Sequence, residues 1–221
     1  MLLAAACLIV TALPAVAQTA RAVLVEWDDT RRAEDHVEKR YDGSVTWRTE
    51  RVKSADGQDD MLIRADVDIP GRNLKMAMSV RRNLDPSVQA GHLIEMKFTV
   101  TPDYIHSGPG EVFGVFMKET EGEKPAPEVL QGTTAKTNVA GAYVTAVWNT
   151  CKNLALMKGD PWFAIYFTRT IRPTAYLMVE KGQAGQAAFD AVFAAWERSA
   201  GATAKSPACP RADAESANSP G

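Results

Sequence analysis

The segment DYIHSGPGE holds the densest group of side chains that could do chemistry. His106 lies within five positions of Asp103, Ser107 and Glu111. A histidine among carboxylates could bind a metal ion, or it could activate the serine hydroxyl as the nucleophile of a hydrolase. One histidine with scattered oxygen atoms is a small ligand set, however, and the Gly-Pro-Gly that follows is typical of a turn. The pattern therefore favours a surface loop, with a hydrolase as the lower-ranked alternative.

His92 is the second candidate, at the start of the segment HLIEMKFTV. Alternation places it on the apolar face of a strand with Ile94, Met96 and Phe98. A buried neutral imidazole needs partners for its two ring nitrogens, whereas a histidine at the end of a strand could reach water. We expect a structural histidine and not a ligand-binding one. If the ring is buried and neutral, acidification should protonate it and weaken the fold.

The sequence EKGQAG, from Glu180 to Gly185, is the third candidate because its two glycines precede a helix. Backbone N–H groups at the start of a helix attract anions. Glu180 places a negative charge beside such a site, and no Lys, Ser or Thr follows the second glycine. We therefore interpret Gly182 and Gly185 as the corner between a strand and a helix.

The common catalytic and phosphate-binding motifs are missing from the sequence. It contains no G-x-S-x-G, H-E-x-x-H, C-x-x-C or G-x-x-x-x-G-K-[ST] pattern. The 25 basic and 27 acidic residues sum to -2 and are interspersed along the chain. Nucleic-acid binding requires a concentrated basic face, which this distribution does not provide. We expect a protein without enzymatic activity, cofactor, metal or nucleic-acid partner.

Period-two alternation predicts strands along most of the chain. MLIRADVDI, NLKMAMSVR and HLIEMKFTV each set an apolar face against a polar face, which predicts an antiparallel meander. The turn Pro70-Gly71-Arg72 joins the first two, and we expect Gly71 to supply its positive φ. WFAIYFT is apolar on both faces, as in a central strand covered on each side. The strands predicted outside the meander are 43–52, 112–117, 143–148, 162–168 and 175–180.

Two helices interrupt the strand pattern. One is short, near 150–158, with Thr150 as its N-cap. The other follows Gly182 and places Phe189, Phe193 and Trp196 on one apolar stripe. Eight strands and two helices predict a mainly β fold, an antiparallel β-sandwich or curled barrel with the C-terminal helix packed on the sheet.

The two terminal segments differ in composition from the rest of the chain. Residues 1–17 have an uncharged apolar run and an A-x-A site, so we expect a signal peptide and a periplasmic or secreted protein. An uncleaved membrane anchor is the alternative, although the run is shorter than the roughly 20 residues of a spanning helix. We expect a polar linker over 18–40, one domain over 41–198 and a disordered Ala/Ser/Pro tail over 199–221.

Two cysteines, Cys151 and Cys209, remain after such a cleavage. An oxidising compartment permits a disulfide between them. Cys209 lies in the predicted disordered tail, however, and two lone cysteines define no framework. The sequence therefore favours unpaired cysteines over a bridge.

Landmarks over 41–196, among them IRADVDIPGRNLKMAMSVRRNLD and VEKGQAGQAAFDAVFAAW, resemble an uncharacterised family of exported alphaproteobacterial proteins. LALMKGDPWFAIYF, RPTAYLMVEKG and AAFDAV are also distantly similar to the closing third of the invasion-associated locus B proteins. That resemblance implies an exported, β-sandwich-like molecule linked to bacterial entry into host cells. The chain lacks the closely spaced cysteine pair of that family ahead of the short helix, and no functional residue is carried over.

These observations together predict a protein that acts by binding. Our first expectation is a protein-interaction module of the cell envelope with an envelope or host protein as its partner. The alternative is a carrier for a small apolar ligand, because a curled sheet can enclose a cavity. Its candidate lining residues are Met76, Met78, Phe98 and Trp162, with His92 beside them.

Overall fold

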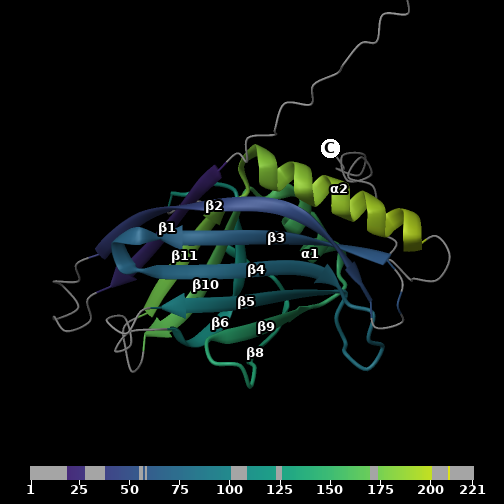
Figure 1. Cartoon of the computed structure of the whole chain (residues 1–221), viewed down its shortest axis with the longest axis horizontal. Coiled ribbons are helices and arrows are strands. Elements are labelled where there is room, and N and C mark those ends of the chain that lie inside the picture. Colours follow the sequence, from purple (N-terminus) through teal and green to yellow (C-terminus); the bar gives the residue numbers. More distant parts are fainter. Residues whose placement is uncertain are drawn as a thin grey trace, which may run out of the picture.

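The computed structural model describes residues 19–27, 38–54, 57, 59–100, 109–122, 126–169, 174–200 and 209. The predicted signal peptide, 1–17, and most of the predicted tail therefore lie outside the described residues. Within the described residues, the chain forms one sheet and two α-helices (Figure 1). The prediction of a mainly β fold is confirmed.

A single antiparallel sheet of eleven strands is formed by these described residues. The strands are β1 (Thr19–Trp27), β2 (Glu38–Lys53), β3 (Asp59–Ile69), β4 (Leu74–Arg82), β5 (His92–Val100), β6 (Pro109–Lys118), β7 (Glu128–Val129), β8 (Gly132–Lys136), β9 (Ala142–Val147), β10 (Trp162–Arg169) and β11 (Thr174–Glu180). Their order across the sheet is β7-β6-β10-β11-β1-β2-β3-β4-β5-β9-β8. The predicted meander is confirmed as β3, β4 and β5, which pair in sequence.

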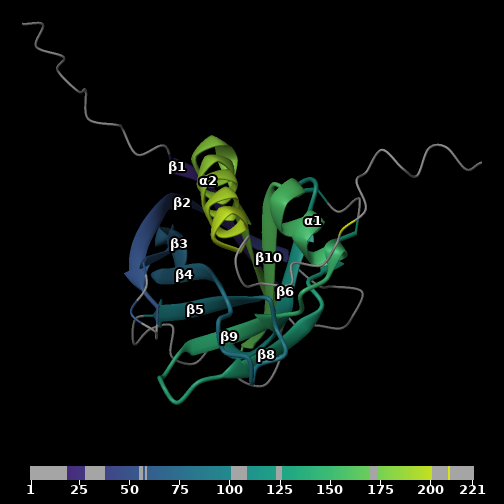
Figure 2. The ribbon, with the colours of Figure 1, turned by 90° about the vertical axis from the view of Figure 1, so that its right-hand side faces the viewer.

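The sheet curls into a half-barrel, which decides between the two predicted shapes in favour of the curled one (Figure 2). β7 pairs with β6 at one edge, and β8 pairs with β9 at the other. Only Leu130 and Gln131 separate β7 from β8 along the chain. Residues 128–136 therefore bridge the two edges, and Tyr143 adds a side-chain link by donating its hydroxyl to the carbonyl of Pro109 at 2.9 Å.

The predicted linker over 18–40 is wrong at both of its ends. β1 lies in the middle of the sheet between β11 and β2, and β2 begins at Glu38. The sequence ARAVLVEW forms β1 because both of its faces are covered, so Val23 and Leu24 are each at most 1% exposed although they point to opposite faces. The folded domain thus includes Thr19.

The turn between β3 and β4 differs in detail from its prediction. Pro70–Arg72 forms a single 3₁₀ turn, η2, and the residue with positive φ is Asn73 at 47°, not Gly71. Asn73 donates its backbone N–H to the carbonyl of Pro70. Asparagine tolerates this left-handed conformation better than most residues, so the turn closes without a glycine at that position.

The main core lies on the concave face of the sheet, under α2 (Gly182–Ala200). The stripe predicted for this helix is buried there, with Phe189 fully covered and Phe193 and Trp196 at 4% and 6% exposure. Packing of the C-terminal helix on the sheet is confirmed. α2 includes Ser199 and Ala200, so the predicted tail begins two residues too early. In the part of the chain that is described, no helix has both the length and the apolar character needed to cross a membrane.

Helix α1 (Cys151–Gly159) begins as predicted, with the Thr150 hydroxyl accepting a hydrogen bond from the N–H of Asn153. The Asn153 side chain is fully buried and bonds to the residues that bridge the sheet edges. Its Oδ1 accepts from Gln131 N–H at 2.9 Å, and its Nδ2 donates to the carbonyls of Gln131 and Trp148. A single side chain thus bonds to backbone groups of Gln131, between β7 and β8, and of Trp148, directly after β9.

Asn153→Ala is expected to lower the free energy of unfolding by about 1 to 3 kcal/mol, because it removes the acceptor of the Gln131 N–H and one of the two hydrogen bonds to each of the carbonyls of Gln131 and Trp148. Chemical denaturation followed by circular dichroism measures the change. Asn138→Ala is the control, since Asn138 is exposed. Equal midpoints for the two variants would show that solvent replaces these bonds without loss.

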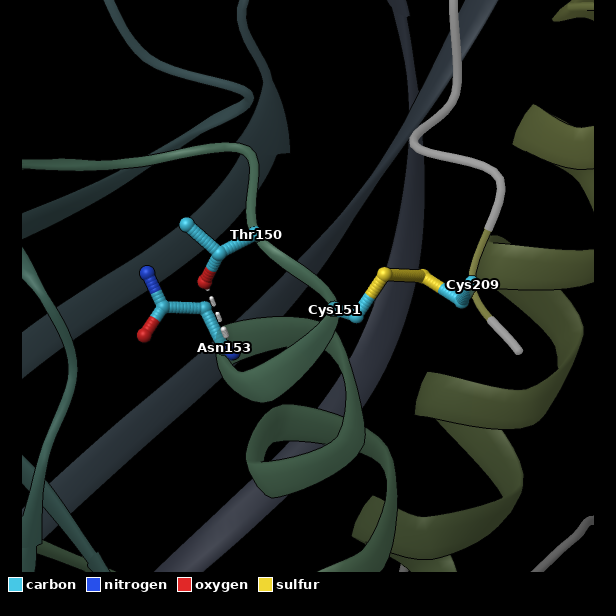
Figure 3. The surroundings of a disulfide bond; sticks show 4 residues. All are labelled: Thr150, Cys151, Asn153 and Cys209. Carbon is cyan, nitrogen blue, oxygen red and sulfur yellow. Dashed lines mark hydrogen bonds between the residues drawn. A yellow bond between two sulfur atoms is a disulfide. The ribbon is translucent and has the colours of Figure 1, made fainter. Parts of the chain in front are cut away.

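Cys151 and Cys209 form a disulfide, with their Cα atoms 5.3 Å apart (Figure 3). The expectation of unpaired cysteines is therefore wrong. Figure 3 shows the bridge at the first turn of α1, beside the Thr150 N-cap. The residues around Cys209 carry no apolar pattern that could predict its position, so the sequence alone could not show that it reaches α1.

Candidate functional site

The first candidate group does not come together in the part of the chain that the structure describes. His106, Asp103 and Ser107 lie outside the described residues, while Glu111 is exposed near the start of β6. Among the described residues, no three His, Cys, Asp or Glu side chains gather to form a metal site. The described residues therefore do not test the hydrolase hypothesis.

The glycine corner is a packing feature. A Cβ on Gly182, where φ is +56°, would lie 2.8 Å from the Cβ of Ala20, and one on Gly185 would lie 3.0 Å from two atoms of the Trp47 ring. The indole of Trp47 donates to the carbonyl of Glu180 at 2.8 Å and holds the corner in place. Both glycines therefore allow α2 to approach β1 and β2 closely.

Lys181 lies between Glu180 and Gly182, and its side chain bonds to helix α1. Its Nζ donates to the carbonyl of Met157 in the last turn of α1 at 2.6 Å and lies 4.4 Å from the centroid of the Phe189 ring. Burial lowers the pKa of Lys181 to about 8, against the opposing effect of Asp160 and Asp190. The ammonium group satisfies the end of α1, where helices attract cations.

The candidate carrier residues are divided between the two faces of the sheet. Met76, Met78 and Phe98 belong to the concave core and are at most 4% exposed. Trp162 lies on the convex face with Val23, Val25, Ala164 and Met178. β10 has apolar side chains on both of its faces, as predicted for a covered central strand. Trp162 therefore lies on the opposite face of the sheet from Met76, Met78 and Phe98. The four side chains therefore do not line one cavity.

His92 is buried at the end of β5, with 7% exposure. Its ring lies against Phe193 and Trp196 of α2, with centroids 5.4 and 5.3 Å away. Burial lowers the pKa of His92 from 6.5 to about 4. The imidazole is neutral near pH 7 as a result, which agrees with the structural histidine expected from the sequence.

The convex face carries a feature that the sequence analysis missed, a row of half-buried aromatic side chains. One side chain comes from each of β1, β11, β10 and β6, and they are Trp27, Tyr176, Tyr166 and Phe116. Neighbouring ring centroids lie 5.1, 5.2 and 4.8 Å apart, close to the spacing of strands in a sheet. We call these four residues the outer aromatic row.

Two exposed apolar side chains lie on β6 and β7, the strands at this edge of the sheet. Val129 of β7 is opposite Phe116 and is 47% exposed, while Phe113 projects from an irregularity in β6 and is 56% exposed. Tyr166 pairs with Gly114, which has no side chain to cover its ring. Burial raises the pKa of the Tyr166 phenol, so its hydroxyl stays a neutral hydrogen-bonding group.

Next to the row, the same face is covered by residues 119–122, which follow β6. Glu121 makes ion pairs with Arg21 of β1, at 2.7 Å, and with Arg40 of β2. Because β10 and β11 lie between β6 and β1, this segment crosses the sheet above Trp162. The Arg21 guanidinium also lies 5.9 Å from the Trp162 ring. The outer aromatic row lies on the same face, beside the surface that this segment covers.

The chain matches no family model, no curated protein and no solved structure. The candidate site is therefore defined by its own chemistry. It is an apolar, aromatic surface on the convex face of the sheet, formed by side chains of β1, β11, β10 and β6.

Proposed function

We propose that the protein is a non-catalytic, periplasmic or secreted binding protein of the cell envelope, and that the outer aromatic row is the surface on which it binds a partner protein. The observation that carries this proposal is the row of four half-buried aromatic rings in contact with one another, together with the exposed side chains of Phe113 and Val129 on β6 and β7. Contiguous exposed apolar surface of this kind marks interaction sites in soluble proteins. An envelope or host protein is the partner class that the resemblance to the locus B proteins favours.

The composition of the surface supports a protein partner. Trp, Tyr and Arg are the side chains most enriched among residues that dominate binding energy at protein interfaces. The row contributes Trp27 and two tyrosines, and the neighbouring Arg21 and Arg40 are held in place by Glu121. Rings fixed by contact with one another lose little conformational entropy on binding, so they are suited to act as anchors.

The carrier alternative has less support. Its concave candidates, Met76, Met78 and Phe98, are occupied by packing against one another and against neighbouring strands. Trp162, on the other face, lies beneath the segment that carries Glu121. No specific contact of the described residues favours a small apolar ligand over the surface proposed above.

Site-specific photo-crosslinking tests the proposal in the cell envelope. A photoreactive phenylalanine at position 116 should give a discrete adduct, because Phe116 is in the row. The same group at position 148 should not, since Trp148 is exposed at 47% but lies outside the row. Mass spectrometry then identifies the partner.

The double variant Tyr166→Ser/Tyr176→Ser should bind the purified partner at least about 30-fold more weakly, as expected for losing roughly 2 kcal/mol of anchor energy. Trp148→Ser is the matched control and should bind as the parent does. Calorimetric titration measures both. Unchanged affinity of the double variant, with an unchanged circular dichroism spectrum, contradicts the proposal.

A further inference from the structure

His92 lies where the sheet supports the last two turns of α2. In Figure 2 the helix lies on the concave side, between the wall of β2 to β5 and the wall that contains β10 and β6. Phe193 and Trp196 rest on the imidazole, and Trp196 also donates its indole N–H to the carbonyl of Met61 at 2.9 Å. Residues 192–199, the end segment of α2, therefore use His92 as part of their packing surface.

The imidazole of His92 has a feature that is unusual for a structural histidine, a buried nitrogen without a hydrogen bond to any described residue. Its Nδ1 is buried and has no hydrogen-bond partner among the described residues. Buried polar atoms are nearly always satisfied, and an unpaired one in a native structure calls for an explanation. The site tolerates the neutral ring and provides no acceptor for the additional N–H of a charged ring at this nitrogen.

The strands around His92 add a positive charge. Arg82 of β4 is its direct cross-strand neighbour, and the opposite neighbour on β9 is the apolar Val147. Asp60 of β3 bonds to the Arg82 guanidinium at 2.9 Å, and Ser199 accepts a second bond from it. The nearby carboxylate is thus already paired with an arginine.

The helices add a second ion pair. Glu197 of α2 pairs with Lys158 of α1 at 2.8 Å. The Lys158 ammonium lies 5.6 Å from the centroid of the Phe193 ring, on which His92 packs. Asp60 on β3 and Glu197 on α2 therefore each already have a cationic partner.

We propose that His92 makes the end of α2 an acid-operated lid. When the imidazole takes a proton, it becomes a cation beside Arg82 with an unsatisfied N–H, and residues 192–199 detach from the sheet and uncover Phe193 and Trp196. The disulfide between Cys151 and Cys209 keeps the chain beyond the helix attached to α1 during this opening. The acid-operated lid depends on the packing of the concave face and not on the outer aromatic row. An experiment can therefore contradict the lid without contradicting the proposed function, and the reverse is also true.

The direction of the pH dependence follows from the two states of His92. In the detached state the imidazole titrates near its ordinary pKa of 6.5, and in the docked state near 4. Between these values the detached state binds more protons, so docking weakens as the pH falls from about 6.5 and is weakest below about 4. A difference of this size corresponds to an increase of up to roughly 300-fold in the opening constant, since each pKa unit is tenfold.

Hydrogen exchange resolved by mass spectrometry measures this opening in the full chain. After correction for the intrinsic pH dependence of exchange, peptides from residues 192–199 should lose protection between pH 6.5 and 4.5, while peptides from β3 to β5 stay protected. Full protection of residues 192–199 at pH 4.5 overturns the proposal. Simultaneous loss in helix and strands also overturns it, because that result describes global acid unfolding.

Two variants assign the effect to His92. His92→Phe keeps an aromatic ring against Phe193 and Trp196 but cannot titrate, and His92→Gln serves if the phenylalanine variant does not fold. Either should hold residues 192–199 protected at pH 4.5. Asp60→Asn and Glu197→Gln remove the nearby carboxylates and should retain the acid response of the parent. An unchanged acid response in His92→Phe or His92→Gln, or its loss only in the carboxylate variants, overturns the assignment.

Discussion

Trp196→Ala is expected to lower the free energy of unfolding by about 3 to 5 kcal/mol, the cost of replacing a buried tryptophan by alanine. The indole is 6% exposed and contacts both His92 and Phe193. Its N–H donates to the Met61 carbonyl, so the substitution also leaves a buried acceptor on β3 without this donor. For a domain of this size the thermal midpoint should fall by roughly 10 to 15 °C.

The matched control for this variant is Trp148→Ala. Trp148 is 47% exposed, so the same chemical change there should alter the midpoint by no more than about 1 to 2 °C. Differential scanning calorimetry of both variants and the parent measures the shifts. If Trp196→Ala unfolds with the parent, the end of α2 does not contribute to the core, and the lid inferred above loses its physical basis.

Removal of the disulfide should have an effect of similar size. The bridge between Cys151 and Cys209 closes a loop over a separation of 58 residues. The chain-entropy estimate for such a loop is about 4 kcal/mol of stabilisation through the unfolded state. The loop contains α1, β10, β11 and α2, so these four elements lie in the segment whose unfolded freedom the bridge restricts.

Reduction provides a test that needs no substitution in the core. Addition of a thiol reductant should lower the denaturation midpoint of the parent to that of Cys151→Ser/Cys209→Ser. The same reductant should leave the double variant unchanged, which separates cleavage of this bond from other effects of the reagent. A parent midpoint that does not respond to complete reduction, verified by thiol titration, would show that the bridge adds no stability.

Local patterns were sufficient to predict most of the fold. The alternation in β3, β4 and β5, the N-cap Thr150 and the apolar stripe ending at Trp196 are each contained within one segment, and each was found where it was predicted. β10 was also interpreted correctly as covered on both faces. These features depend on the regular repeat of side-chain directions along a helix or a strand, and this repeat is visible within a single segment of the sequence.

Features that depend on distant parts of the chain were not predicted. β1 has an apolar run without clear alternation because α2 covers one of its faces and the segment after β6 covers the other. The run is also short and precedes the polar residues 28–39, so it was included in the predicted linker. The disulfide was missed for a related reason, since the position of Cys209 is set by a partner 58 residues away.

The outer aromatic row is another feature that depends on distant parts of the chain. Each of its residues lies on a recognisable strand, but Trp27 and Tyr176 become neighbours only because β1 pairs with β11. The antiparallel order of a sheet leaves no periodic signal in the sequence. His92 was easier to place, because its inward direction follows from alternation within β5, whereas its contacts with α2 do not.

The position of β1 has a consequence for how the molecule is made. Its neighbours, β2 and β11, come from opposite ends of the chain, and Ala22 pairs with Val179. Pairings of such long sequence separation close late and slow the folding reaction. A nascent chain that has not yet produced β11 leaves one side of β1 unpaired in the middle of the future sheet. The two halves of the sheet can therefore join only after β11 has been synthesised, and the chain stays incompletely folded and open to chaperones until then.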